Sequence, residues 1–243
     1  MHCHILPGVD DGADGIETAR AMAQMAWTCG TDRIIATPHF CRPDQPKRLS
    51  LAKYRRDVDL LQQDLQRQGC PLQLKAGMEL FATEELSGLL ERQEFLTLAD
   101  SRYLLVEFFF DEDAGFMEES LQQIWEHGFT PIVAHPERYY AVQEEPDIAA
   151  AWFLQGCILQ LNKGTVLGHM GASAGRTAWR LLRQGLAHVV ASDAHSAHRR
   201  NPDLSTVRDV IGQDLSWRYA EILLEENPYL IFQNERIVPT GSG

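Results

Sequence analysis

The 243-residue sequence contains no CxxC pair and no long apolar run. Its five cysteines are odd in number and scattered, at positions 3, 29, 41, 70 and 157, which favours a reducing compartment over a disulfide framework. No stretch of about 18 apolar residues occurs, and no basic-then-apolar leader precedes the first histidine. We therefore expect a cytoplasmic protein without membrane insertion.

Positive charge is also scarce. Against 34 acidic residues there are 22 lysines and arginines, which gives a formal net charge of −12. Non-specific binding to nucleic acid or to anionic lipid needs a basic surface, so neither is expected as a partner. An anionic substrate would need positive charge concentrated at one place.

Two catalytic motifs are missing as well. There is no GxxxxGK[ST] phosphate loop, so no motif supports nucleotide hydrolysis. Thiol-based tyrosine phosphatases need an arginine six positions after a cysteine. The residues at that spacing are Val9, Ile35, Lys47, Ala76 and Lys163. That mechanism is therefore absent.

Short apolar runs rich in β-branched residues recur along the chain and are typical of buried strands. They occupy residues 33–38, 72–77, 103–108, 130–136, 158–162 and 188–195, and the residues from Met1 to His4 give a seventh. Helical segments alternate with these runs. This alternation, in a chain of this length, predicts one α/β domain over residues 1–243, with seven parallel strands closed or nearly closed into a barrel.

The helical segments are recognised by apolar residues that share one face. One face carries Ala19, Met22, Ala23 and Ala26, and another carries Tyr54, Val58, Leu61 and Leu65. Glycines at positions 30, 69, 128 and 185 stand where such helices should end.

The residues that end the apolar runs are nearly all of types that bind metal ions. Six of the seven runs end in them: His2, His4, His39, Glu79, Glu107, His135, Asp193 and His195. In a β/α barrel the C-terminal strand ends converge on one mouth, so side chains distant in sequence meet there. The sequence therefore predicts that these eight side chains surround a metal cluster.

Each signal is weak by itself. A lone histidine such as His39 is more often a loop or packing residue. Glu79 and Glu107 indicate metal binding more strongly, because burying a carboxylate at the end of an apolar run is costly unless it is paired or coordinated. The alternative for each is a buried salt bridge. The joint arrangement favours metal. Eight ligands exceed the need of one ion, so we predict two or three divalent ions, with Mn, Fe, Zn or Mg suited to the donors.

Two arginines lie close to predicted ligands. Arg138 follows His135 by three residues and Arg200 follows His195 by five. Their planar guanidinium groups suit phosphate oxygens, although pairing with surface acids is the alternative. In an acidic protein, cations beside a metal cluster favour hydrolysis of a phosphate ester, with metal-bound hydroxide as the nucleophile.

The strings HxHxLPGxDDG, IATPH, GMEL, SRYLLVEF, PIVAHPERY and SDAHxxxxR occur in this order across nearly the whole chain. Together they resemble the PHP (polymerase and histidinol phosphatase) superfamily, and within it the bacterial tyrosine-protein phosphatases of capsular and exopolysaccharide operons, the CpsB/CapC type. The resemblance implies a distorted seven-stranded β/α barrel, a trinuclear centre often assigned manganese, and hydrolysis of phosphotyrosine.

The resemblance also assigns roles. It carries metal binding onto the eight strand-end residues and phosphate contacts onto Arg138 and Arg200. As a partner it implies a phosphotyrosine-bearing protein, the tail of a membrane tyrosine autokinase that regulates polysaccharide export.

Other side chains are predicted to support the reaction. Aromatic residues that follow the ligands are expected either to flank the phenyl ring or to seal the barrel mouth: Phe40, Phe109, Phe110 and Tyr139. Asp10 and Asp11 are expected to orient His2 or His4.

Two rival functions stay open. One is a PHP hydrolase acting on a small phosphate ester, such as histidinol phosphate, or on a nucleotide. The other is a catalytically silent metal-binding module. Relatives usually carry a few residues before the HxH pair, and Met1 stands in their place. We therefore expect either a start a few codons upstream or a first strand held weakly at this seam.

Overall fold

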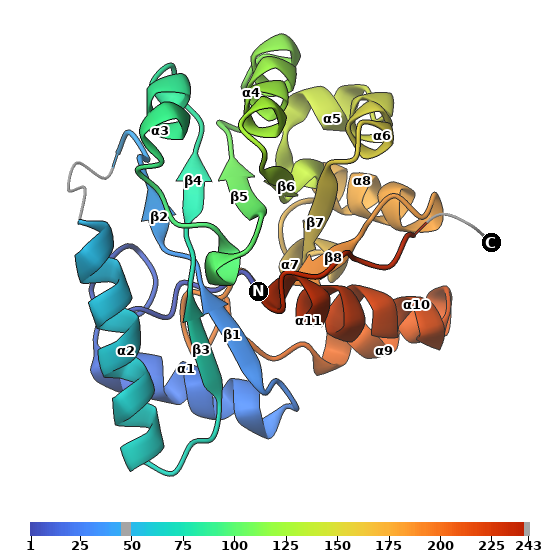
Figure 1. Cartoon of the computed structure of the whole chain (residues 1–243). Coiled ribbons are helices and arrows are strands. Elements are labelled where there is room, and N and C mark those ends of the chain that lie inside the picture. Colours follow the sequence, from blue (N-terminus) through green and yellow to red (C-terminus); the bar gives the residue numbers. More distant parts are fainter. Residues whose placement is uncertain (45–49, 241–243) are drawn as a thin grey trace.

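The computed structural model describes residues 1–44 and 50–240 and has a mixed α/β fold, with most helices around the outside of the strands (Figure 1). The described residues form eight strands: β1 (Arg33–Ala36), β2 (His39–Phe40), β3 (Gln73–Ala76), β4 (Glu79–Phe81), β5 (Tyr103–Glu107), β6 (Thr130–Ala134), β7 (Ile158–Asn162) and β8 (Val189–Ala191). β1 pairs with β3, and a second sheet runs in the order β2-β4-β5-β6-β7-β8. All pairs are parallel. The predicted parallel α/β class is therefore confirmed.

The same residues form eleven α-helices and three other helical segments. They are α1 (Ile16–Thr28), α2 (Leu51–Arg67), α3 (Leu86–Arg92), η1 (Leu98–Asp100), α4 (Ala114–Glu126), η2 (Pro136–Arg138), α5 (Tyr140–Glu144), α6 (Asp147–Leu154), α7 (Lys163–Val166), α8 (Ala172–Arg183), α9 (Ser205–Asp214), α10 (Trp217–Glu221), η3 (Ile222–Glu226) and α11 (Asn227–Phe232). Within the described ranges, none of these helices combines the length and apolar character that crossing a membrane requires.

The predicted helix faces are confirmed. The four residues named on α1 and the four named on α2 are all buried against the strands. Each fully buried large apolar side chain contributes about 1.5–3 kcal/mol relative to an exposed one. The four predicted helix-stop glycines all have positive φ, between 69° and 92°, a conformation that glycine adopts without steric penalty.

Two predicted strands end early, and each is followed by a second short strand beyond its predicted bounds. The run 33–38 forms β1 only as far as Ala36, and β2 begins at His39 after Pro38, because proline has no N–H to donate to a neighbouring strand. The run 72–77 forms β3 only as far as Ala76, and at Gly77 an added Cβ would lie 2.8 Å from Ile35 Cγ2. The two strand segments therefore approach closely at the break. Eight strands in two sheets replace the seven strands predicted from sequence.

The predicted first strand, Met1 to His4, is reduced to an isolated parallel bridge between Cys3 and Ala194. The backbone still bonds on both sides. His4 N–H donates to Ala194 O at 2.8 Å, and Thr37 N–H donates to Cys3 O at 3.0 Å. A proline-glycine turn begins after Leu6, so the segment is too short for a regular ladder. It nevertheless fixes His2 and His4 between β8 and the β1–β2 junction.

Candidate metal centre

All eight predicted ligands lie in one buried cluster at the C-terminal side of the strands. None is more than 7% exposed. The strand register explains part of this convergence, because His39 lies beside Glu79 in the β2–β4 pair and Phe81 lies beside Glu107 in the β4–β5 pair. The ring centroids of His4 and His195 are 3.9 Å apart. Residues from both ends of the chain therefore meet in one place.

Glu79 occupies the middle of this cluster and is completely buried. Its Oε1 lies 3.2 Å from Nε2 of both His2 and His135. Its Oε2 lies 2.9 Å from His39 Nδ1 and 3.4 Å from His4 Nε2. One carboxylate thus faces four imidazoles, so both of its oxygens are within reach of several candidate ligands.

Three groups of donor atoms in the cluster are close enough together to hold a cation. They are His4–Asp11–His39–His195, His2–His4–Asp193 and His39–Glu79–Glu107, and within each group the donor atoms lie within 4.8 Å of one another. Mixed imidazole and carboxylate sets of this kind suit Mn, Fe or Zn. The donor chemistry therefore fits a multinuclear centre.

Several buried donor atoms in the cluster make no hydrogen bond within the described residues. They are His39 Nδ1, Glu79 Oε2, Glu107 Oε2, His135 Nδ1 and His195 Nε2. Most of them lie close to an opposite charge, as His39 Nδ1 does at 2.9 Å from Glu79 Oε2, but without hydrogen-bond geometry. Their concentration at one place is expected of atoms arranged for a cation.

The charges of the cluster are strongly coupled. Burial opposes charge on the imidazoles, but Glu79, Asp11 and Glu107 raise the pKa of His39 to about 12. Glu107 and Glu79 likewise overcome burial and raise the pKa of His135 to about 9. Burial alone would raise the pKa of Glu79, yet the histidines hold it well below its usual range. The carboxylates thus concentrate negative charge that protons or metal cations must balance.

A chain of amide hydrogen bonds on β7 orients the ligands. Asp193 Oδ2 accepts from Asn162 Nδ2 at 2.6 Å, Asn162 Oδ1 accepts from Gln160 Nε2 at 3.0 Å, and Gln160 Oε1 lies 2.7 Å from His2 Nδ1. An ionised carboxylate can only accept hydrogen bonds, so Asp193 sets the donor-to-acceptor direction of the whole series of hydrogen bonds. His2 must then donate from Nδ1, which leaves Nε2 available for a cation.

Sequence reasoning missed Gln160 and Asn162. β7 is the one predicted strand that ends without a metal ligand, so the search for ligand types assigns it no role. Two polar residues two positions apart on a buried strand share a face, because side chains alternate along a strand. That spacing in ILQLN is the signal that identifies them.

We expect Gln160→Met to lower metal affinity about 10- to 100-fold, since His2 Nδ1 loses the acceptor that fixes its orientation. Methionine keeps the length of the side chain. Affinity is measured by competition with a fluorescent chelator, and folding by circular dichroism. Gln155→Met on the exposed surface is the matched control. Equal affinities in the two variants would show that the amide chain does not orient the ligand.

Both predicted phosphate-binding arginines point at the cluster. Arg200 Nη2 lies 2.6 Å from Asp193 Oδ2, and Arg138 Nη1 lies 4.0 Å from the same oxygen. Arg138 also stacks over the ring of Phe110 at 4.2 Å, and Arg200 Nε is buried without a hydrogen bond. Two guanidinium groups therefore converge beside the ligands, with donor capacity left for an anion.

The backbone is strained at two residues that lie close to these arginines. His135 has φ +35° and Asp193 has φ +46°, both in the left-handed region that non-glycine residues rarely adopt. The turn at His135 leads into η2, which carries Arg138. Strain of this kind concentrates at functional sites, where the surrounding structure maintains it.

The predicted ring-flanking aromatics divide into two pairs. Phe40 and Tyr139 are buried in the core, and the Tyr139 hydroxyl donates to Ala134 O at 2.8 Å. Their predicted contact with a substrate ring is therefore wrong, because their rings fill the interior. Phe109 is 47% exposed and Phe110 is half-buried beside Arg138, so these two remain accessible.

The two aspartates after the HxH pair have separate positions. Asp10 Oδ2 lies 2.6 Å from His4 Nδ1, which is the orienting contact expected for it. Asp11 instead lies 3.4 Å from His39 Nε2 and 3.3 Å from His195 Nε2. Asp11 thus belongs with the candidate ligands, a role that sequence reasoning did not give it.

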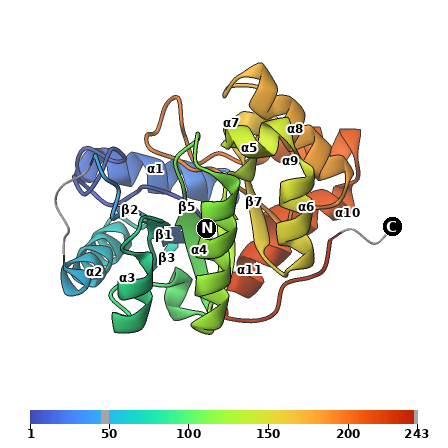
Figure 2. The same ribbon diagram turned by 90° about the horizontal axis from the view of Figure 1, so that it is seen from above.

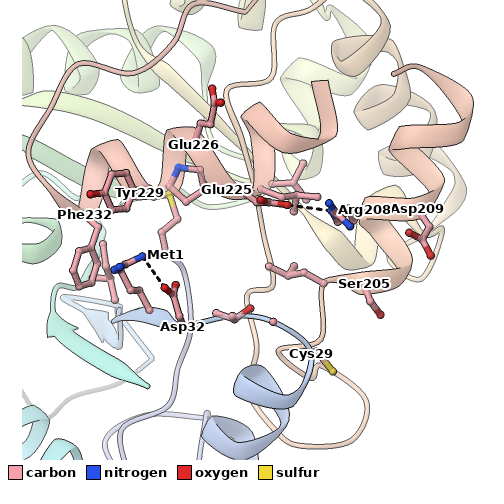
Figure 3. A pocket seen from close by; sticks show the side chains of 18 residues that line it. Met1, Cys29, Asp32, Ser205, Arg208, Asp209, Glu225, Glu226, Tyr229 and Phe232 are labelled. Atoms are coloured by element: carbon pink, nitrogen blue, oxygen red, sulfur yellow. Dashed lines mark ion pairs between the residues drawn. The ribbon is translucent and has the colours of Figure 1, made fainter. Parts of the chain in front are cut away.

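A cavity of about 660 Å³ lies away from the cluster (Figure 3). Its lining includes Met1, Arg33 at the start of β1 and Tyr229 on α11, with an Arg208–Glu225 ion pair of 3.1 Å at its side. None of the eight predicted ligands, all of which the structure describes, lines it. We therefore place the chemistry at the cluster and not in this cavity.

The parallel fold and the buried donor cluster define a candidate α/β metalloprotein. The chain belongs to the CpsB/CapC family of capsular polysaccharide synthesis, whose model matches residues 1–233. This match confirms the family recognised from the sequence motifs.

Similar proteins cover nearly the whole chain. It is 32% identical to the tyrosine-protein phosphatase YwqE of Bacillus subtilis, over 98% of this chain and 92% of the relative. It is 28% identical to the tyrosine-protein phosphatase CpsB of Streptococcus pneumoniae, over 98% of this chain and 99% of the relative. A crystal structure from a study of YwqE and CpsB, described as unique metal-dependent tyrosine phosphatases, superimposes with a TM-score of 0.91 at 31% identity, over 100% of this chain and 98% of that one.

Proposed function

We propose that this chain is a metal-dependent protein-tyrosine phosphatase of capsular or exopolysaccharide synthesis. The observation that carries the proposal is the convergence of eight buried ligands with two arginines that both point at Asp193. The similarity to YwqE and CpsB over nearly the full length supports phosphotyrosine as the substrate.

The proposed ligands are the eight strand-end residues, joined by Asp11. They would hold two or three divalent ions, of which manganese is our first choice and Fe, Zn and Mg are the alternatives. Glu79 would be shared between ions, because its Oε1 faces His2 and His135 while its Oε2 faces His39 and His4. When bound, such ions activate water at neutral pH and neutralise charge on a phosphoryl group.

The residues of the chain provide the remaining requirements. Arg138 and Arg200 would hold the phosphoryl oxygens by charge-assisted hydrogen bonds as negative charge shifts during displacement. Phe109 and Phe110 would lie against the phenyl ring. The phenol has a pKa of about 10 and so leaves readily, which reduces the need for a dedicated general acid.

We further propose that residues 1–243 form one distorted seven-stranded barrel. β1 with β2 and β3 with β4 would each count as one bent strand, and residues 2–4 would be the seventh. Support comes from the backbone bonds of Cys3 and His4 to Thr37 and Ala194, which link β8 to the β1–β2 junction.

The proposed partner is the phosphorylated tail of a membrane tyrosine autokinase, and the proposed location is the cytoplasm. The odd, scattered set of five cysteines without a CxxC pair supports a reducing compartment. Nucleic acid is not expected, because the net charge of −12 opposes it.

The proposal is tested by the turnover of metal-loaded protein on a phosphotyrosine peptide, a phosphoserine peptide and histidinol phosphate. We expect kcat/KM to be at least about tenfold higher for phosphotyrosine, since a phenol is a far better leaving group than an alcohol. A preference for histidinol phosphate would favour the small-ester alternative. Full metal content without hydrolysis of any aryl phosphate would favour the silent module.

A further inference from the structure

A groove of about 630 Å³ lies between α1 and the loop that follows β8. Figure 2 shows this loop, in orange, beside α1. The lining includes Asp11, His195 and Arg200, so the groove opens onto the candidate metal centre. Its size is that of pockets which hold drug-sized ligands, and it exceeds the space that one phosphorylated side chain needs.

Two acidic side chains on the α1 side of the groove already have partners within the protein. Asp14 bonds to the hydroxyl of Thr18, and Glu17 pairs with Arg20 at 2.7 Å. These carboxylates therefore have partners before any ligand enters.

The opposite side carries a cation without a partner. Arg199 is exposed and lines the groove, and within the described ranges its guanidinium group makes no hydrogen bond or ion pair. Its neighbour Arg200 is held by Asp193. On this side of the groove, the charge free to meet a ligand is therefore positive.

The loop that carries Arg199 is held firmly. Arg200 O accepts from the N–H groups of both His195, at 2.8 Å, and Ser196, at 3.1 Å. The buried Lys163 Nζ donates to Asn201 O at 2.5 Å and to Asp203 O at 2.8 Å. The loop backbone that carries Arg199 is thus fixed before substrate arrives, which lowers the conformational entropy lost on binding.

We propose that this groove binds the residues flanking the phosphotyrosine of a protein substrate, and that Arg199 selects an acidic flanking side chain. The proposal rests on the proposed phosphatase function, because it concerns the same site. It narrows the substrate from any phosphotyrosine to one next to aspartate or glutamate.

The test uses metal-loaded full-length protein and phosphotyrosine peptides that differ only within two positions of the phosphotyrosine, carrying aspartate or lysine there. Each rate is divided by that of the same enzyme on p-nitrophenyl phosphate. We expect kcat/KM to favour the aspartate peptide by about fivefold, the effect of roughly 1 kcal/mol from one charge contact, and to do so through KM.

Arg199→Glu should reverse this preference toward the lysine peptide, and Arg199→Gln should abolish it. Arg56→Glu, on the exposed face of α2 outside the groove, changes the net charge equally and should keep the wild-type preference. A merely structural role of Arg199 would lower all rates without reversing the order.

Wild-type protein that hydrolyses both peptides equally, or an Arg199→Glu variant that keeps the wild-type order, would overturn the proposal. Failure of wild-type protein to hydrolyse p-nitrophenyl phosphate would instead contradict the phosphatase function itself. The two failures are therefore distinguishable.

Discussion

Replacing Glu79 by glutamine is expected to lower kcat/KM for a phosphotyrosine peptide by about a thousandfold or more. Glutamine keeps the volume of the side chain but removes the charge that four imidazoles face. One end of the amide would also present N–H donors to the position of a cation. Metal content, measured by elemental analysis, should fall together with activity.

The matched control is Glu91→Gln on the exposed face of α3, which should keep both activity and metal. Circular dichroism and the melting temperature separate loss of metal from loss of fold. If the Glu79→Gln variant retained wild-type activity with a full complement of metal, Glu79 would not be a bridging ligand.

Removal of metal by a chelator is expected to abolish hydrolysis of every aryl phosphate, and add-back of Mn, Fe, Zn or Mg should restore it in an order that ranks the ions. The buried carboxylates and imidazoles are the proposed ligands, so removal of the ions would remove the activated water on which the proposed hydrolysis depends. Elemental analysis of the untreated protein, combined with add-back, identifies the native ions.

Metal add-back should also stabilise the fold. A ligand present at 100 times its Kd adds about 2.7 kcal/mol to the free energy of unfolding, which raises the melting temperature by roughly 5 to 10 °C for a chain of this size. Arg56→Glu should show the same rise. Activity that survives complete removal of metal, or that no ion restores, would contradict metal-dependent hydrolysis.

The candidate ligands were predictable because strand ends are visible in sequence. An apolar run that stops at a histidine or a carboxylate marks a side chain placed at the mouth of a parallel fold, and all eight such residues do converge. The amides of Gln160 and Asn162 were missed because neither is a metal ligand, so searching for ligand types alone passes over β7.

The strand divisions were harder to predict, because they depend on contacts between distant residues. Gly77 leaves room for Ile35, and only the folded arrangement places those two side by side. The bridge between Cys3 and Ala194 also depends on the folded arrangement, because it joins segments that lie far apart in the sequence. Local pattern identifies strands, but not where a neighbour forces one to bend.

That bridge has a consequence for synthesis on the ribosome. His2 O accepts from Asp193 N–H at 3.0 Å, although about 190 residues separate these segments. At roughly 5–20 residues per second, a nascent chain carries both N-terminal histidines for about 10 to 40 s before β8 exists to complete their surroundings. His2 and His4 are thus made long before their final contacts can form, and the candidate centre can assemble only once translation has passed β8.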